Sequence, residues 1–390
     1  MKLPPSGNYA KFEEIKLRDG IASAWISREM DDAPWDKFLQ QSPLGQFQQS
    51  AIWARVKEVE GWKPVRVVVT IDEEMVGGFQ LLWRSSRPGR MGYVAKGPVV
   101  APAHPGLADF ATGLLTRLAR SEKLRALIVQ PPDLCGQMAA ELATGGFDLE
   151  TLEGVNDATW VVGLGDGFEA VERRMNGETR RKARRAAERG ITIREGGRDD
   201  IQTFFDLMLS TCRRQEVSPS PPDVRSFFAL WDAARLSGAA RLTFAEWEGK
   251  PLAGQIDICF GQTVTQWKKG WSSSEAKRFP NDLLTHQALQ WATANGFQFF
   301  DFAAFDRSMA IRMLNGEPLT PEQEKSRYIF LARMGGTPRL LPEAQIYLPN
   351  SVIRMAYRTL FRNKIRKAKA KSRTLGQLSG SSERNPPPAN

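Results

Sequence analysis

Residues 241–303 read RLTFAEWEGKPLAGQIDICFGQTVTQWKKGWSSSEAKRFPNDLLTHQALQWATANGFQFFDFA, and this stretch decides the fold. Its periodicity predicts strands at 241–247, 251–260 and 263–271, a helix at 281–295 and a strand at 297–303. The predicted helix starts after Pro280 and stops at Gly296, which are ordinary helix boundary signals. The order strand, turn, strand, strand, helix, strand predicts an α+β domain built on a mixed sheet with flanking helices.

The first half of the chain repeats this order. Its predicted elements are strands at 65–71, 75–83 and 92–100, a helix at 106–120 and a strand at 126–130. An amphipathic helix precedes each half, at 47–60 and at 200–214. Residues correspond too, because Lys96-Gly97 matches Lys269-Gly270 in the equivalent strand. The sequence therefore predicts a tandem duplication of one domain, with chance recurrence of a common strand order as the alternative.

Three parts follow from this reading: a first domain at 1–165, a second at 166–348 and a tail at 349–390. The join contains a strand at 159–164 and a helix that is interrupted at Gly177. The tail is predicted to hold a basic amphipathic helix at 351–372, followed by a segment whose composition is typical of disorder.

Charge and composition exclude several classes of protein. The net charge is +10, but residues 351–390 hold ten Lys and Arg against one acid, so the body is almost neutral and its net charge does not by itself indicate a nucleic-acid binder. The three cysteines lie far apart, and the N-terminal residues lack the apolar segment of a secretory signal, so we expect a cytoplasmic protein with reduced thiols. With two histidines, His104 and His286, a histidine-rich metal site is excluded.

The strand-to-helix connections lack the usual signal for a tightly bound nucleotide. The segments VVAPAHPGLADF (99–110) and WSSSEAKRFPNDLL (271–284) carry no glycine-rich phosphate turn. This counts against an NTPase or a dehydrogenase, and weakly against the usual coenzyme A site. We expect no metal and no resident cofactor, and a donor group that arrives on a co-substrate.

The region 266–306 holds the densest set of candidate site residues. Lys268 and Lys269 should project to opposite faces of their strand, so that one lysine faces a substrate phosphate or carboxylate. Each of the other candidates has a functional and a structural interpretation. Trp267 either stacks on a substrate or packs in the core, and Asn281 either contacts the substrate or caps the helix. His286 is an acid–base group or a structural histidine, and Asp301 and Asp306 are general bases or parts of a solvated loop.

Three basic features offer further surfaces. Five cations crowd one helix and form either a solvated face or a surface for RNA: Arg180, Arg181, Lys182, Arg184 and Arg185. Arg214 ends the helix at 200–214, where it either satisfies the negative helix end or clamps a phosphate. The helix at 351–372 suits an anionic membrane surface, or it docks on the body.

At these residues the sequence resembles the FemABX-like branch of the GNAT superfamily, whose best-known members add amino acids from aminoacyl-tRNA to peptidoglycan precursors. The segments that carry the resemblance are GQFQQSAIWARVKEVEGWKP (45–64), YVAKGPV (93–99), RKARRAAERGITI (181–193), TCRR (211–214) and PNDLLTHQALQWATANGFQFFDF (280–302). They keep the family's order and spacing over roughly residues 35–347. The resemblance implies two tandem GNAT-like domains, the first on the acceptor side and the second on the donor side.

The resemblance also assigns residues. It implies that Lys57 and Arg214 contact the phosphates or sugar of the acceptor. Lys96 stands where the family has an arginine, and Trp267 where it commonly has a tyrosine. Leu331 occupies the position of a phosphate-binding lysine, for which Arg333 or Lys325 is the expected substitute.

The function predicted from these features is transfer of an aminoacyl group from aminoacyl-tRNA to an amine of a cell-envelope precursor, at the inner face of the membrane. Positioning supplies most of the rate, and Asp306, Asp301 or a substrate phosphate accepts the amine proton. One alternative is an acyl-CoA-dependent N-acyltransferase that acts on an amino sugar in exopolysaccharide biosynthesis. The other is a non-catalytic protein that binds membrane or RNA.

Overall fold

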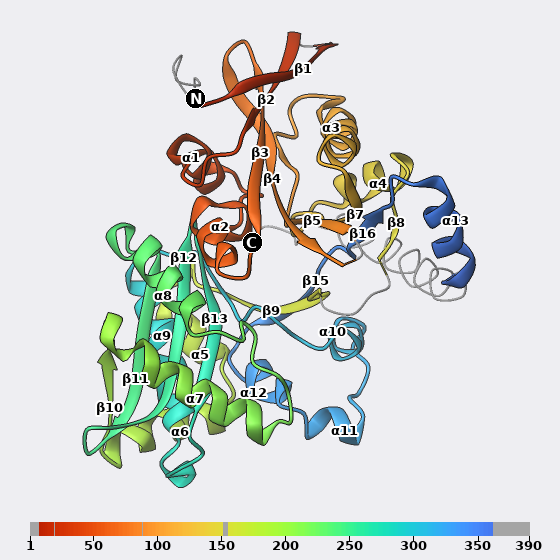
Figure 1. The fold of residues 1–390 in the computed structure, drawn as a ribbon. Helices are drawn as coiled ribbons and strands as arrows, with labels where there is room; N and C mark the ends of the chain where they lie inside the picture. Colours follow the sequence, from red (N-terminus) through yellow and green to blue (C-terminus); the bar gives the residue numbers. More distant parts are fainter. Residues whose placement is uncertain (1–7, 19, 88, 151–154, 362–390) are drawn as a thin grey trace, which may run out of the picture. The chain divides into compact units, whose positions relative to one another are not determined.

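The computed structural model describes residues 8–18, 20–87, 89–150 and 155–361, and it divides the chain into two compact units (Figure 1). The first unit contains residues 1–28, 64–155 and 342–390. The second contains residues 29–63 and 156–341. Each unit is built on one mixed sheet with helices packed against it, which confirms the predicted α+β class.

The first unit holds a nine-stranded sheet within the described ranges. Its strands are β1 (Ala10–Leu17), β2 (Gly20–Ser27), β3 (Lys63–Ile71), β4 (Glu74–Ser86), β5 (Gly89–Ala95), β6 (Val99–Val100), β7 (Leu124–Gln130), β8 (Asp148–Leu149) and β16 (Gln345–Tyr347). The order is β1-β2-β3-β4-β5-β7-β16-β8, with β6 on β4. Antiparallel pairing gives way to a parallel pair between β5 and β7.

The helices of the first unit are α3 (Leu107–Ser121), α4 (Gly136–Thr144) and α13 (Ser351–Leu360). One face of α3 is apolar at helical spacing, and its Leu114 and Leu118 are fully buried with Val67 and Val69 of β3. Gly92 of β5 has no side chain because a Cβ there would lie 2.5 Å from Leu124. These contacts form one continuous core between α3 and the sheet.

The second unit holds a seven-stranded sheet, counted over the residues with described placement. Its strands are β9 (Ala158–Gly163), β10 (Ile191–Glu195), β11 (Ala240–Trp247), β12 (Lys250–Phe260), β13 (Thr263–Trp271), β14 (Phe299–Asp301) and β15 (Thr337–Leu340). Their order is β10-β11-β12-β13-β14-β9-β15. The pair β13–β14 is parallel, and β12–β13 is antiparallel.

The helical elements of the second unit are α1 (Ala33–Gln41), η1 (Phe47–Gln49), α2 (Ala51–Glu58), α5 (Phe168–Arg174), α6 (Gly177–Glu188), η2 (Arg198–Asp200), α7 (Ile201–Arg214), α8 (Arg225–Ala234), η3 (Arg235–Ser237), η4 (Ala276–Arg278), α9 (Pro280–Ala294), α10 (Arg307–Leu314), α11 (Pro321–Glu324) and α12 (Tyr328–Ala332). Leu283 and Leu284 of α9 pack on Ala253 of β12. Helix α7 approaches β13 so closely that a Cβ at Gly270 would lie 2.5 Å from the Met208 nitrogen.

Most predicted elements are confirmed, with three differences. The strand expected at 92–100 is interrupted, because Lys96 takes a left-handed φ of 55° and a cis Gly97–Pro98 bond follows. The helix expected at 351–372 is described as α13, while residues 362–372 and the expected disordered tail lie outside the described ranges. Among the described helices, none is long and apolar enough to cross a bilayer.

The third difference concerns the bounds of the two parts. We expected domains at 1–165 and 166–348, but two strands exchange between the halves: β9 belongs to the second sheet, and β16 inserts between β7 and β8 of the first. Residues 29–63 also belong to the second unit, where Trp53 of α2 packs edge-on against Trp267 of β13, 5.8 Å between ring centroids.

Candidate functional site

The candidate site lies where β13 separates from β14. The two strands pair in parallel only from Thr263 to Thr265, whereas β13 continues to Trp271. A register shift between Ile256 and Asp257 of β12 places a bulge opposite them, with Trp267 as the extra residue of β13. Bulges re-aim side chains and are frequent beside active sites. The second half of β13 therefore carries side chains that the sheet alone would not place together.

On one face of this strand segment, a lysine and a tryptophan of β13 lie beside a lysine and a tryptophan of α2. The Lys57 ammonium lies 5.3 Å from the centre of the Trp53 ring, and the Lys268 ammonium lies 5.9 Å from the centre of the Trp267 ring. Trp267 also contacts Phe227 of α8 at 5.0 Å. Lys57 is ion-paired with Glu60 at 2.8 Å. The predicted core-packing role of Trp267 is thus combined with a position between two cations.

Lys268 stands out electrostatically, since no carboxylate of the described chain lies within ion-pair distance of it. Burial is the largest cause that lowers its pKa below the ordinary lysine value, and the charge of Lys57 lowers it further. A half-buried cation beside a second cation favours an anion between or above them. The arrangement fits a phosphate or carboxylate of a substrate.

Arg214 ends helix α7 in the same unit. Its guanidinium lies 4.7 Å from the centre of the Trp271 ring and donates a hydrogen bond to the Trp271 carbonyl at 3.3 Å. Its side chain is exposed, and within the described ranges it forms no ion pair. The guanidinium therefore keeps donors available, and the predicted phosphate contact stays a prediction.

The opposite face of the strand carries Lys269. Its ammonium donates to the Thr285 hydroxyl at 2.6 Å and to the Asn281 carbonyl at 3.3 Å, both on α9. Burial lowers the pKa of Lys269 to about 8, and Asp282 and Asp257 oppose that shift. Lys268 and Lys269 thus point to opposite faces, as the alternation of a strand predicts.

A buried polar chain lies beside Lys269. Gln266 donates to the Gln255 side-chain oxygen at 2.5 Å, and Gln255 donates to the Asp257 carboxylate at 2.7 Å. Asp257 is fully buried, and burial raises its pKa to about 7. Burial therefore raises the pKa of Asp257 and lowers that of Lys269 inside the layer between β12, β13 and α9.

Asn281 is not the helix cap that we predicted. Helix α9 begins at Pro280, and its cap residue is Phe279 in a left-handed conformation with φ 59°. The correction has a simple cause: Pro280 lacks an amide proton and suits the first helical position, so the helix starts one residue earlier. Asn281 therefore occupies the first turn, and only its carbonyl is engaged by Lys269.

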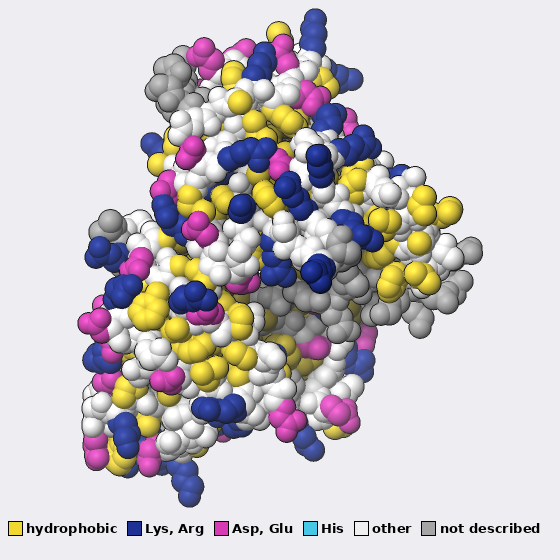
Figure 2. Space-filling view, in the orientation of Figure 1, with side chains coloured by type: hydrophobic (Ala, Val, Ile, Leu, Met, Phe, Trp, Pro, Cys, Tyr) yellow, Lys and Arg dark blue, Asp and Glu magenta, His cyan; other side chains and the backbone are white. Residues whose placement is uncertain are grey.

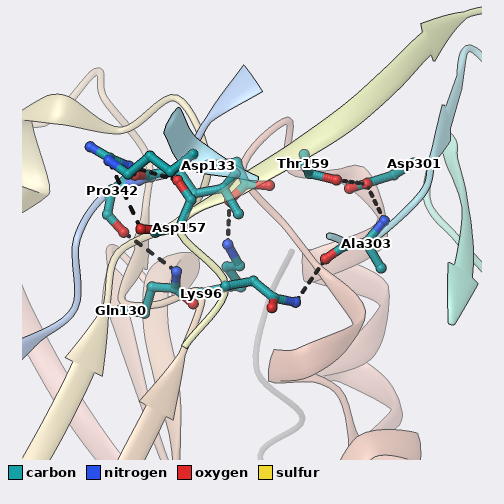
Figure 3. Close-up of polar contacts among 11 residues, drawn as sticks. Lys96, Gln130, Asp133, Asp157, Thr159, Asp301, Ala303 and Pro342 are labelled. Carbon is teal, nitrogen blue, oxygen red and sulfur yellow. Dashed lines mark hydrogen bonds and ion pairs between the residues drawn. The ribbon is translucent and has the colours of Figure 1, made fainter. Parts of the chain in front are cut away.

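The two candidate bases have structural partners. Figure 3 shows the Asp301 carboxylate, which accepts from the Thr159 hydroxyl and from the Ala303 amide at 2.7 Å. Asp306 is the cap of α10, where its carboxylate accepts from the Met309 amide at 2.8 Å and from the Ser308 hydroxyl at 2.6 Å. These bonds account for both carboxylates without chemistry, and their role as bases stays a prediction.

The third catalytic candidate, His286, lies on α9 and contacts Glu172 of α5 through Nε2 at 3.0 Å. Its ring meets Phe168 edge-on at 5.0 Å. Its Nδ1 is buried without a hydrogen-bond partner in the described chain. These contacts place it on the side of α9 that packs against α5.

Lys96, predicted to bind substrate, is buried in the first unit. Its ammonium forms an ion pair with Asp133 at 2.6 Å (Figure 3). In the second unit Arg333 is exposed at the end of α12, and its charge helps to lower the pKa of Glu178. Neither contact tests the substrate role expected for these two residues.

The basic helix α6 packs through its small residues. Thr179, Ala183 and Ala186 are buried at helical spacing, whereas Lys182 pairs with Glu178 at 2.8 Å. Four arginines are exposed and form no ion pair in the described part of the chain: Arg180, Arg181, Arg184 and Arg185. This uncompensated face is available to a polyanion. No cluster of metal-ligating side chains occurs among the residues that the structure describes.

Sequence reasoning assigned no role to Lys268, Trp53 or Asp257. The sequence left open whether Lys268 or Lys269 faces the substrate. The bulge that keeps Trp267 and Lys268 on one face is not visible in the hydrophobic pattern. Trp53 is part of the quoted opening motif, but its partner Trp267 lies more than two hundred residues away. The signal that was available for Asp257 is a charged residue within the otherwise apolar stretch 251–260.

Two family models match the chain: a FemAB family model over residues 30–146 and an acetyltransferase (GNAT) domain model over residues 173–307. Lipid II:glycine glycyltransferase of Staphylococcus aureus (strain MRSA252) is 24% identical over 331 residues, which is 81% of this chain and 76% of that protein. The protein of the same name from Staphylococcus saprophyticus is 26% identical over 233 residues. That match covers 57% of this chain and spans about half, 56%, of the relative.

Solved structures agree on the architecture. A crystal structure of FemX has a TM-score of 0.68 at 18% identity, over 80% of this chain and 95% of that chain. A structure of L-PGS from Bacillus licheniformis has a TM-score of 0.53 at 12% identity, over 86% of this chain and 98% of the other. Both likenesses concern the fold. The two family models confirm the resemblance to the FemABX-like branch of the GNAT superfamily, and the solved structures agree with the fold that it implies.

Proposed function

We propose that this protein transfers an aminoacyl group from aminoacyl-tRNA to an amine of a phosphate-bearing cell-envelope precursor. The observation that carries the proposal is the pair Lys57 and Lys268 around the tryptophans Trp53 and Trp267, beside the point where β13 leaves β14. The relatives named lipid II:glycine glycyltransferase support an acceptor of this class. A lipid-linked acceptor would bring the protein to the cytoplasmic face of the membrane.

The two lysines would hold the anionic part of the acceptor. Lys57 shares its charge with Glu60, whereas Lys268 has no carboxylate partner in the described chain, so Lys268 gains more from a bound phosphate. The tryptophan pair offers apolar and cation-binding faces between them. Holding the acceptor here places its amine next to the donor ester, and this positioning supplies most of the rate enhancement.

The chemical step is an acyl transfer between oxygen and nitrogen. The acceptor amine attacks the ester carbonyl of the donor, a nitrogen–carbon bond forms, and the bond to the ribose oxygen of the tRNA breaks. Asp306, Asp301 or the acceptor phosphate accepts the amine proton. That proton then passes to the departing ribose oxygen. Backbone amides near the β13 bulge would stabilise the developing oxyanion.

The donor would be held through its phosphate backbone. The exposed arginines Arg180, Arg181, Arg184 and Arg185 form one uncompensated face of α6. Such a face binds nucleic acid by releasing counterions, so affinity falls with salt. If all four arginines contact phosphates, replacing them with glutamine should reduce the slope of log affinity against log salt by about 3.

A donor comparison tests the proposal. Purified protein is offered radiolabelled aminoacyl-tRNAs or acyl-CoAs together with lipid-linked and nucleotide-linked envelope precursors, and label that enters the acceptor is counted. We expect transfer from charged tRNA that ribonuclease abolishes and that Lys268→Met reduces. The matched control is Lys250→Met, which removes an exposed lysine from the turn that starts β12. Transfer from acyl-CoA alone, or no transfer from either donor, would contradict the proposal.

A further inference from the structure

The short helix α13 has two apolar faces, and among the described residues only one of them packs against other elements. Ile353 and Phe361 pack with Tyr357 against Ile346 and Leu348, which belong to β16 and the residue after it. The Tyr357 hydroxyl donates to the Leu149 carbonyl at 3.0 Å. The helix is therefore fixed to the first unit by this inner face, as one of the two alternatives for the tail predicted.

Further bonds hold α13 in place. Arg358 donates to both oxygens of Asp148, at 3.0 and 2.8 Å. Asn350 caps the helix by accepting from the amides of Val352 and Ile353 at 2.9 and 3.1 Å. A helix of ten residues is marginal alone, so these contacts are what make α13 a rigid platform.

The outward face of α13 is apolar as well. Its residues recur at positions i, i+3, i+4, i+7 and i+8 and are all exposed: Val352, Met355, Ala356, Thr359 and Leu360. Val352, Met355 and Leu360 keep 68%, 66% and 79% of their surface accessible. Figure 2 shows apolar side chains gathered on the surface over α13. A contiguous exposed apolar stripe marks an interaction site more often than chance exposure.

The charge of the sequence that contains and follows α13 selects the partner of this stripe. Residues 351–390 carry ten Lys and Arg against one acid, whereas the remaining 350 residues carry a net charge of only +1. A second copy of the chain would bring two such basic segments together, and they would repel each other. An anionic lipid surface satisfies both features, because apolar side chains enter the interface and cations meet the head groups.

We propose that the outward face of α13, defined by Val352, Met355, Ala356, Thr359 and Leu360, docks the protein on an anionic membrane surface. Docking is by partial insertion of one helix face, because α13 lies in the interface and does not span the bilayer. The proposal does not depend on the aminoacyl donor or on the residues that hold the acceptor. It places the first unit, rather than the second, in contact with lipid.

Vesicle binding tests this proposal with the full chain. Binding to phosphatidylcholine vesicles with and without phosphatidylglycerol is measured by sedimentation at low and high salt. We expect binding that requires phosphatidylglycerol and weakens with salt. The double variant Met355→Asp/Leu360→Asp should bind on the order of tenfold to a hundredfold more weakly. Leu314→Asp is the matched control, since Leu314 is also an exposed apolar residue at a helix end, and it should bind like wild type.

Three results would overturn the proposal: equal binding of the double variant and wild type, no preference for anionic vesicles, or a dimer in light scattering that the double variant abolishes without vesicle binding. An unchanged thermal midpoint shows that the double variant is folded; if it is not, Met355→Gln/Leu360→Gln is used and should still lose binding. Transfer to a water-soluble acceptor should be unchanged in either variant. Loss of lipid binding is thereby separated from failure of the transferase reaction.

Discussion

The lysines beside the equivalent strand pairs of the two units differ in whether they form an ion pair. In the first unit β5 and β7 pair in parallel up to Ala95 and Gln130, and Lys96, which follows, meets Asp133 at 2.6 Å. In the second unit β13 leaves β14 after Thr265 and carries Lys268 and Lys269 beyond the last paired residue. Neither of these lysines forms an ion pair with a described carboxylate.

The difference shows where a ligand can act. At the closed pair, the charge of Lys96 is compensated within the fold by Asp133. An open pair that holds two cations without carboxylate partners is incomplete, and burial lowers the pKa values of both lysines as a consequence. The first junction has its counter-ion within the fold, whereas the second is the junction at which we propose that an anion binds. Four substitutions test this contrast.

The largest effect is expected at the closed junction. Lys96→Met should lower the free energy of unfolding by about 3–5 kcal/mol, because Asp133 stays buried and loses its cation. Chemical denaturation at neutral pH measures this value. The double variant Lys96→Met/Asp133→Leu should recover much of the loss. A loss below about 1 kcal/mol in the single variant would show that the pair is not the source of stability at this junction.

Lys269→Met should behave differently and depend on pH. The folded pKa of Lys269 is lowered to about 8, below the value in the unfolded chain, so the folded state binds fewer protons between pH 8 and about 10.4. Stability of wild type relative to the variant should therefore rise across that window, by on the order of 2 kcal/mol. At pH 7 the variant should lie within about 1 kcal/mol of wild type.

The measurement is denaturant unfolding of both proteins at several pH values between 7 and 10. Groups that do not interact with Lys269 cancel in the difference, so the contribution of Lys269 remains together with that of Asp257 and Asp282, which interact with it. A difference that stays flat with pH would mean that Lys269 has an ordinary pKa and that its burial carries no electrostatic cost.

At the open junction, Lys268→Met should act on the reaction rather than on the fold. Removing one charged contact to the acceptor should lower kcat/KM by about tenfold to a hundredfold, mostly through KM. Lys268→Arg should keep most of the activity, and thermal stability should be unchanged or raised in Lys268→Met because a cation without a carboxylate partner is lost. Unaltered KM for a phosphate-bearing acceptor would remove Lys268 from the site.

The smallest effect is expected at Asp306. Asparagine caps a helix about as well as aspartate, so Asp306→Asn should leave both stability and turnover near wild type. Asp306→Ala should cost about 1 kcal/mol of stability while turnover per folded molecule is kept. A loss of turnover in Asp306→Asn with unchanged stability would make this residue the base after all.

The sequence by itself determined the repeated core of both units. Strands β11, β12 and β13 and helix α9 match the predicted ranges within one residue, because alternation, Pro280 and Gly296 are local signals. Lys57 and Trp267 were named as substrate contacts from motif and position, and that role stays a prediction. Local pattern is sufficient wherever a segment's own periodicity fixes which side is buried.

Tertiary structure alone decided how the chain is shared between the units and what faces the site. The strands β9 and β16 cross to the sheet of the other half, and short strands such as β16 carry too few residues for a pattern. The β13 bulge is equally invisible locally, yet it sets the side on which Lys268 lies. Such choices depend on contacts between distant residues, as with Trp53 and Trp267, and distant contacts leave no periodicity in the sequence.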